Sequence, residues 1–282
     1  MSVVLDILPA ILFSVLSSNA SSIYGVTLDS IDRIEQSVDA IKSLPKKMTT
    51  RVIFDEIPAT SYTQALRLLA PHTDVMGLLF DSEYIPNYSV AQYKARVNEY
   101  LNLHENTVSI WEIGNEVNGE WTGNPSVVAQ KTIYAYEEAK RRGYKTALTL
   151  YYNDYTYNDG CWAKPEEKMR EWASSRLPQT LKNGIDYLFI SYYEEDCDNY
   201  RPSLAEWESV FKDLGKLFPH ARLGFGEVGT TTMNKQDYLE RYYTLDIKHN
   251  RYVGGYFWWY FKQDMVPKSK ALWSYFNTVL KR

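Results

Sequence analysis

The sequence has few cysteines and lacks long runs of like charge or of apolar residues. Its 282 residues include two cysteines, Cys161 and Cys197, which allow one disulfide at most. No extended Lys/Arg run occurs and the formal net charge is −4, so we expect no nucleic-acid partner. The apolar stretch at residues 7–16 is too short to span a membrane, so we expect no membrane partner either.

The N-terminal residues 1–22 form an apolar segment that allows two interpretations. Residues 7–16, followed by the small residues at 17–21, resemble the hydrophobic region and cleavage site of a secretory signal. However, residues 1–6 carry only Asp6, where a signal peptide carries basic residues. The alternative is a structured segment that covers the bottom of the domain. On balance we expect a secreted rather than a cytoplasmic protein, and cleavage of the segment is left open.

Aromatic residues, by contrast, are frequent. They make up 15% of the sequence, with 24 tyrosines and 8 tryptophans. Flat rings stack on the apolar faces of sugars, which is compatible with a carbohydrate-binding cleft, although most of these rings are expected in the core. The fractions of hydrophobic and charged residues are those of an ordinary soluble domain.

The sequence alternates eight times between a short apolar run and a longer segment of helical periodicity. The predicted strands are residues 24–29, 51–55, 75–81, 108–115, 145–151, 187–192, 222–226 and 255–260. The predicted helices are residues 31–41, 62–69, 90–103, 126–142, 165–181, 204–217, 235–247 and 270–280. Strict alternation of this kind predicts a parallel sheet covered by helices.

Eight strand–helix units predict an α/β fold with a single closed (β/α)8 TIM barrel of eight parallel strands over residues 23–282. A doubly wound open sheet is the alternative, but it usually begins with a glycine-rich turn after the first strand. Here the first strand is followed by Ser30, Ile31 and Asp32. The barrel is therefore favoured, and it places the active site at the carboxyl ends of the strands.

The histidines and the carboxylates lie at opposite ends of the predicted strands. Each histidine precedes a strand, on the face away from the site: His72, His104, His220 and His249. We therefore expect no histidine-bound metal, no Ser-His-Asp triad and no cofactor. Many carboxylates instead lie at or after the strand ends: Asp29, Asp55, Glu56, Asp81, Glu83, Glu116, Asp154, Glu194, Glu195, Asp196, Glu227 and Asp264. Glycoside hydrolysis is the main chemistry that needs two carboxyl groups and no cofactor.

Two segments narrow the choice among these carboxylates. Residues 111–117 read Trp-Glu-Ile-Gly-Asn-Glu-Val at the end of the fourth strand, and residues 224–229 read Gly-Phe-Gly-Glu-Val-Gly at the end of the seventh. Together they resemble glycoside hydrolase clan A, over residues 24–280. The resemblance implies a retaining mechanism with Glu116 as acid/base and Glu227 as nucleophile. It also implies that Asn115 hydrogen-bonds the sugar 2-hydroxyl.

The same resemblance suggests further substrate-binding residues. Arg51 would lie near Glu227, or would instead pair with Glu112 inside the barrel. Either Tyr192 or Tyr193 would hydrogen-bond the nucleophile. Trp258 or Trp259 would form the floor of the sugar subsite, and strand alternation allows only one of them to point inward; we favour Trp259. The aromatic residues that would extend the cleft or pack its loops are Trp121, Trp162, Tyr151, Tyr152 and Tyr155.

Cys161 and Cys197 follow the fifth and sixth predicted strands, whose loops meet on one face of a barrel. We expect a disulfide at the rim of the cleft, with two unpaired thiols as the alternative. The expected partner is a carbohydrate, and a monomer is favoured. A transglycosylase and a sugar-binding protein without activity remain alternative functions. Glu56, Asp81 and Glu194 are the reserve candidates for the catalytic carboxylates.

Overall fold

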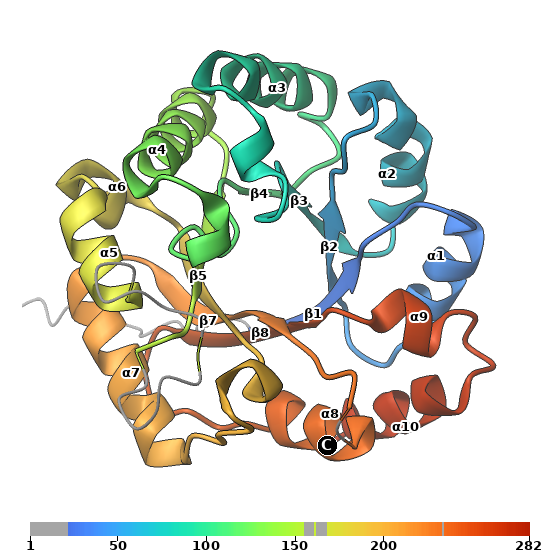
Figure 1. Ribbon diagram of the computed structural model, residues 1–282. Helices are drawn as coiled ribbons and strands as arrows, with labels where there is room; N and C mark the ends of the chain where they lie inside the picture. The colour runs from blue at the N-terminus through green and yellow to red at the C-terminus, as the bar shows by residue number, and fades with distance from the viewer. Residues whose placement is uncertain (1–21, 155–160, 162–167, 233) are drawn as a thin grey trace, which may run out of the picture.

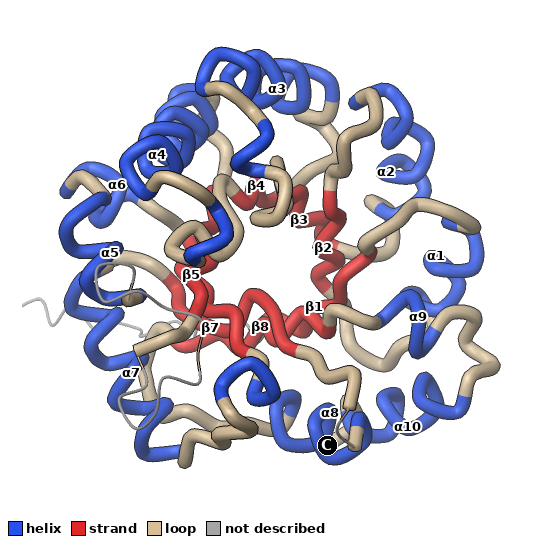
Figure 2. Tube along the Cα trace, viewed as in Figure 1, coloured by secondary structure: helices blue, strands red, loops and turns tan. Residues whose placement is uncertain are grey.

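Eight parallel strands close into one barrel in the computed structural model, in the order in which they occur along the chain (Figures 1 and 2). The structure describes residues 22–154, 161, 168–232 and 234–282. The strands are β1 (Ile23–Leu28), β2 (Thr49–Ile53), β3 (Asp74–Leu78), β4 (Ile110–Glu112), β5 (Thr146–Tyr151), β6 (Tyr187–Tyr192), β7 (Arg222–Val228) and β8 (Tyr252–Trp258). The predicted (β/α)8 TIM barrel is confirmed.

Helices surround the barrel on its outside, as Figure 2 shows. They are α1 (Ile34–Lys42), α2 (Thr63–Leu69), α3 (Val90–Leu103), α4 (Pro125–Arg141), α5 (Met169–Arg176), α6 (Gln179–Gly184), α7 (Leu204–Leu217), α8 (Lys235–Tyr243), α9 (Phe261–Met265) and α10 (Ala271–Val279). Helices α3 and α7 have the bounds that the sequence predicts, because each begins at a capping box, Ser89 with Gln92 and Ser203 with Glu206.

Two predicted helices differ most from the structure, and one helix is additional. The predicted helix at residues 165–181 is two helices, because Pro178 forces Leu177 into an extended conformation between α5 and α6. Helix α8 ends four residues before its predicted end. A short additional helix, α9, precedes α10. None of these differences changes the barrel.

Two layers of apolar side chains hold the barrel together. The larger one lies between the strands and the helices and includes Trp111, Trp172 and Trp258. The smaller one comes from strand residues alone, including Met76, Phe189 and Phe257, and fills the interior as is usual for this fold. The interior is therefore solid, and an open site is left only where the strands end. Within the described residues, no helix is long and apolar enough to cross a membrane.

The predicted N-terminal segment, residues 1–22, lies outside the described residues except for Ser22, which precedes β1.

Candidate active site

A cavity of about 360 Å³ opens at the carboxyl ends of the strands. Two kinds of side chain dominate its lining. The carboxylates are Asp81, Glu83, Glu116, Asp196 and Glu227, and the aromatic residues are Trp121, Tyr151, Tyr193 and Trp259. Ser82 and Asn115 complete the lining. Barrel closure thus brings Glu116 and Glu227, which are far apart in the sequence, into one cavity.

Glu116 follows the short strand β4 in a left-handed backbone conformation, with φ of 48°. Its side chain is 8% exposed and is held by two serine hydroxyls. Ser191 on β6 donates to Oε1 over 2.5 Å, and Ser82 after β3 donates to Oε2 over 3.0 Å. Burial raises the pKa of Glu116 well above its usual range, and the nearby Glu227 carboxylate raises it further. The geometry and the charge both favour a Glu116 that keeps its proton.

Glu227 points into the cavity because of an irregularity in β7. In the pairing of β6 with β7, Ile190 aligns with Phe225 and Ser191 with Glu227, so Gly226 is an extra residue on β7. A Cβ atom at Gly226 would lie 2.5 Å from Thr149 Oγ1 and 2.7 Å from Phe189 Cβ. Only glycine fits this bulge, which directs Glu227 inward rather than toward the helices.

Two donors hold the Glu227 carboxylate. Arg51 Nη1 donates to Oε2 over 2.6 Å, and Tyr193 Oη donates to Oε1 over 2.8 Å. Burial raises the pKa of Glu227, but Arg51 and Tyr193 act in the opposite direction. Because Arg51 pairs with Glu227 and no described cation forms a salt bridge with Glu116, Glu227 ionises first of the pair. The two carboxylates thus have different proton affinities, as general-acid and nucleophile roles require.

Arg51 binds both Glu227 and Glu112, the two partners that the sequence suggests as alternatives. Its Nε and Nη2 donate to the two oxygens of Glu112, over 2.6 and 3.1 Å, while Nη1 binds Glu227. Thr149 also donates to Glu112 Oε1, over 2.5 Å. Arg51 is completely buried, so this network holds the Glu227 carboxylate in position from within the barrel.

Asn115 lines the cavity and is almost fully buried. Its Oδ1 atom has no hydrogen-bond partner among the described residues. A buried acceptor without a donor is costly, so this atom is suited to a donor group supplied by a ligand.

The structure separates the members of each aromatic pair. Tyr193 reaches Glu227, whereas the Tyr192 hydroxyl donates to the carbonyl of Tyr200, outside the cavity. Trp259 lines the cavity and lies over Arg51, with 5.8 Å from the guanidinium carbon to the ring centroid. Trp258 packs among the helices and donates to Asp264. The substrate-binding prediction is therefore narrowed to Tyr193 and Trp259, while Tyr192 and Trp258 are parts of the core.

No motif in the sequence indicates the two serines that hold Glu116. Ser82 also accepts from the indole nitrogen of Trp121 over 3.0 Å, which leaves its own proton for Glu116. Serine is common at the ends of strands and in the loops and helix caps that follow them, and no spacing in the sequence distinguishes Ser82 and Ser191.

Other predicted residues fall outside the cavity. Glu194 is buried and pairs with Arg201 and Arg241, and Glu56 accepts from the Tyr88 hydroxyl at the surface. Tyr152 packs against Tyr192 and Trp207 in the core. Tyr155 and Trp162 lie outside the described residues.

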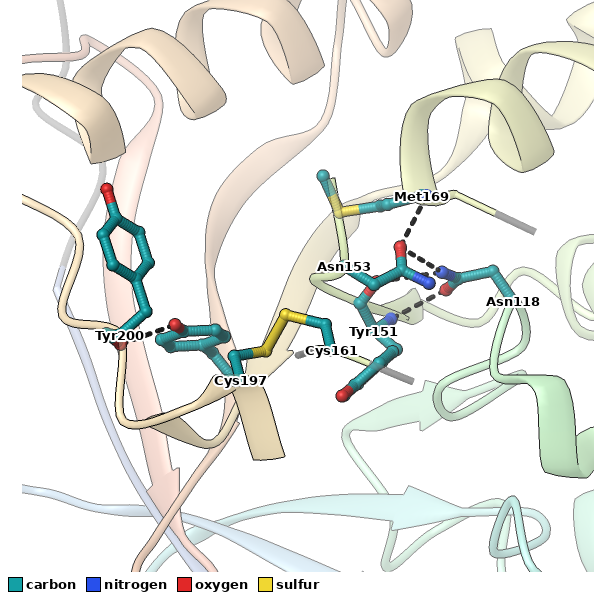
Figure 3. Close-up of a disulfide and its surroundings, with 8 residues drawn as sticks. Asn118, Tyr151, Asn153, Cys161, Met169, Cys197 and Tyr200 are labelled. Carbon is teal, nitrogen blue, oxygen red and sulfur yellow. Dashed lines mark hydrogen bonds between the residues drawn. A yellow bond between two sulfur atoms is a disulfide. The ribbon is translucent and has the colours of Figure 1, made fainter. Parts of the chain in front are cut away.

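Cys161 and Cys197 form a disulfide beside the cavity (Figure 3). Cys197 belongs to the segment that follows β6 and is next to Asp196 of the cavity lining. The Asn118 side chain forms two hydrogen bonds with the main chain of Tyr151. Its Oδ1 accepts from the Tyr151 amide over 2.7 Å, and its Nδ2 donates to the Tyr151 carbonyl over 2.9 Å (Figure 3). Among the described residues, these links join the loop after β4 to the end of β5, and Cys161 to the segment after β6.

Comparison with known proteins identifies the fold. No protein-family model matches the sequence, and no curated protein matches it either. Several solved structures of similar fold are glycosidases. A GH18 chitinase from Pseudoalteromonas aurantia shares 12% identity at a TM-score of 0.60, with 93% of this chain and 99% of that chain covered. The catalytic domain of the major endoglucanase from Xanthomonas campestris pv. campestris shares 14% at a TM-score of 0.58, with 92% and 94% covered.

The likeness extends beyond glycosidases. Orotidine 5'-monophosphate decarboxylase from Methanocaldococcus jannaschii shares 8% identity at a TM-score of 0.50, with 93% of this chain and 99% of that chain covered. At such identities the comparisons establish the barrel, and any function must be argued from the site itself.

Proposed function

We propose that this protein is a retaining glycoside hydrolase of clan A, with Glu116 as the acid/base and Glu227 as the nucleophile. One observation supports this proposal above all others. Two buried glutamates share one cavity, and their surroundings differ in the way the two roles require: hydroxyl groups hold Glu116, and a guanidinium holds Glu227. Trp259 beside them offers a flat apolar face for a sugar ring.

In the first step, a carboxylate oxygen of Glu227 attacks the anomeric carbon while the bond to the leaving oxygen breaks. Glu116 gives its proton to that oxygen, and a glycosyl ester of Glu227 forms. In the second step, Glu116 takes a proton from water, and the resulting hydroxide displaces Glu227. Arg51 and Tyr193 stabilise the departing Glu227 carboxylate. Two inversions at the anomeric carbon give overall retention of configuration.

The Cys161–Cys197 disulfide supports a location in an oxidising compartment, because structural disulfides persist there. This agrees with the expectation of secretion that the N-terminal segment suggests.

The test is a screen of aryl glycosides and polysaccharides, followed by variants of the two glutamates on the best substrate. Glu227→Gln should abolish turnover. Glu116→Ala should lose far less activity on substrates with a good leaving group, which need no proton, and added azide should restore turnover as a glycosyl azide of retained configuration. Glu35→Gln, at an exposed position on α1, serves as the matched control. Wild-type activity in both cavity variants would refute the assignment.

A further inference from the structure

The charges of the cavity are not balanced. Five carboxylates line it, and none of its described lining residues is Lys, Arg or His. The buried cation nearest to them, Arg51, already binds Glu112 and Glu227. With Glu116 protonated, the site still holds a clear excess of negative charge.

The proposed hydrolysis uses neither Asp81, Glu83 nor Asp196 of this lining. Glu83 is exposed to solvent, whereas Asp81 and Asp196 are partly buried, so these two aspartates make the imbalance costly. Asp81 follows β3 and accepts one hydrogen bond, from the main chain of Glu83 over 2.9 Å. Arg51 acts on it only from a distance, and burial raises the pKa of Asp81. Asp196 lies on the opposite loop, beside the disulfide; burial and the adjacent Glu195 raise its pKa to about 6. No described Lys or Arg side chain forms a salt bridge with either carboxylate.

Asn115 adds an independent observation. Its buried Oδ1 is an acceptor without a donor, and it lines the same cavity. A ligand that fits this site therefore brings hydrogen-bond donors to Asn115 and positive charge to the aspartates.

We propose that the substrate is a glycan containing amino sugars with free, protonated amines. This inference rests on the proposed function and specifies its substrate class. A neutral sugar can donate hydroxyl hydrogen bonds to Asp81 and Asp196, but it supplies no charge to balance them, and an unpaired charge that loses its water is costly. An ammonium group supplies both donors and charge, whereas an N-acetyl group has no charge and a uronic acid would be repelled. Trp121, Tyr151 and Trp259 would contact the apolar faces of the rings.

Binding can be measured apart from turnover with the Glu227→Gln variant and calorimetry. The probes are matched oligosaccharides of glucosamine, glucose and N-acetylglucosamine, and a second set of galactose configuration. We expect an amino oligosaccharide to bind at least about tenfold more tightly than its neutral counterpart, equivalent to about 1.4 kcal/mol. The advantage should shrink as salt shortens the Debye length from about 30 Å at 0.01 M to about 3 Å at 1 M.

Asp81→Asn and Asp196→Asn, made in the same background, should each lower the ratio of amino to neutral affinity, and Glu35→Gln at an exposed position on α1 should leave that ratio unchanged. If no amino oligosaccharide in either set binds more tightly than its neutral counterpart, the inference is wrong. Turnover of neutral glycans without that preference would overturn the inference and leave the hydrolase proposal intact. Preferential binding of amino oligosaccharides without turnover of any glycoside would support the inference and refute the hydrolase proposal.

Discussion

At the scale of single residues, the account depends on which glutamate holds the proton. Glu116 must be protonated, so kcat/KM should fall as the pH rises through its pKa, which burial and Glu227 place well above the usual range of a carboxyl group. Glu227 must be ionised, so kcat/KM should also fall as the pH drops through its own pKa. A pH profile should therefore be bell-shaped. Glu116→Gln, assayed with an activated aryl glycoside, should lose the alkaline limb, and an unchanged limb would assign it to another group.

Ser191 offers a finer test of the same idea. Its hydroxyl donates to Glu116 Oε1 and lowers the pKa of that carboxyl, because a donor stabilises the ionised form. Ser191→Ala should therefore move the alkaline limb of the kcat/KM profile to higher pH. Ser274→Ala on α10, remote from the strand ends, is a matched control. An alkaline limb that stays at the same pH or moves to lower pH would show that Ser191 does not lower the pKa of Glu116.

At the scale of elements, two adjacent tryptophans at the end of β8 point in different directions and have different roles. Trp258 is fully buried between the barrel and the helices, so Trp258→Ala should lower the free energy of unfolding by about 3–5 kcal/mol. Trp259 lines the cavity, so Trp259→Ala should mainly lower kcat/KM with a smaller change in stability. Denaturant unfolding and steady-state kinetics on both variants check the pair. The reverse pattern would mean that Trp258 is the residue facing the substrate.

The elements themselves were largely predictable, because the order of apolar runs and periodic segments specifies eight strand–helix units. The directions in which individual side chains point were less predictable. Simple alternation along β7 would turn Glu227 toward the helices with Phe225, and only the bulge at Gly226 reverses this. Ser82 and Ser191 were missed because their role appears only when the loops after β3 and β4 meet the end of β6. Contacts between distant segments leave no local pattern in the sequence.

At the scale of the whole molecule, barrel closure makes the site. Glu116 comes after β4 and Glu227 from β7, while Arg51 comes from β2 and Tyr193 from the end of β6. No single segment holds a catalytic unit. The apolar side chains of the barrel interior lie beneath this network. Among the described residues, Asn118 after β4 is bonded to the end of β5, and the segment after β6 is linked to Cys161. The separation of the two proton affinities is thus a property of the closed barrel.

In the proposed mechanism, Glu227 forms a covalent bond to the substrate sugar. The direct measurement uses a 5-fluoro glycosyl fluoride of the best sugar found in the screen, which slows breakdown of the glycosyl-enzyme and allows it to accumulate. Mass spectrometry of the digested protein should find one sugar per chain, on the peptide that contains Glu227, and none in Glu227→Gln. A sugar attached to another residue, or turnover to a product of inverted configuration without any adduct, would contradict the account.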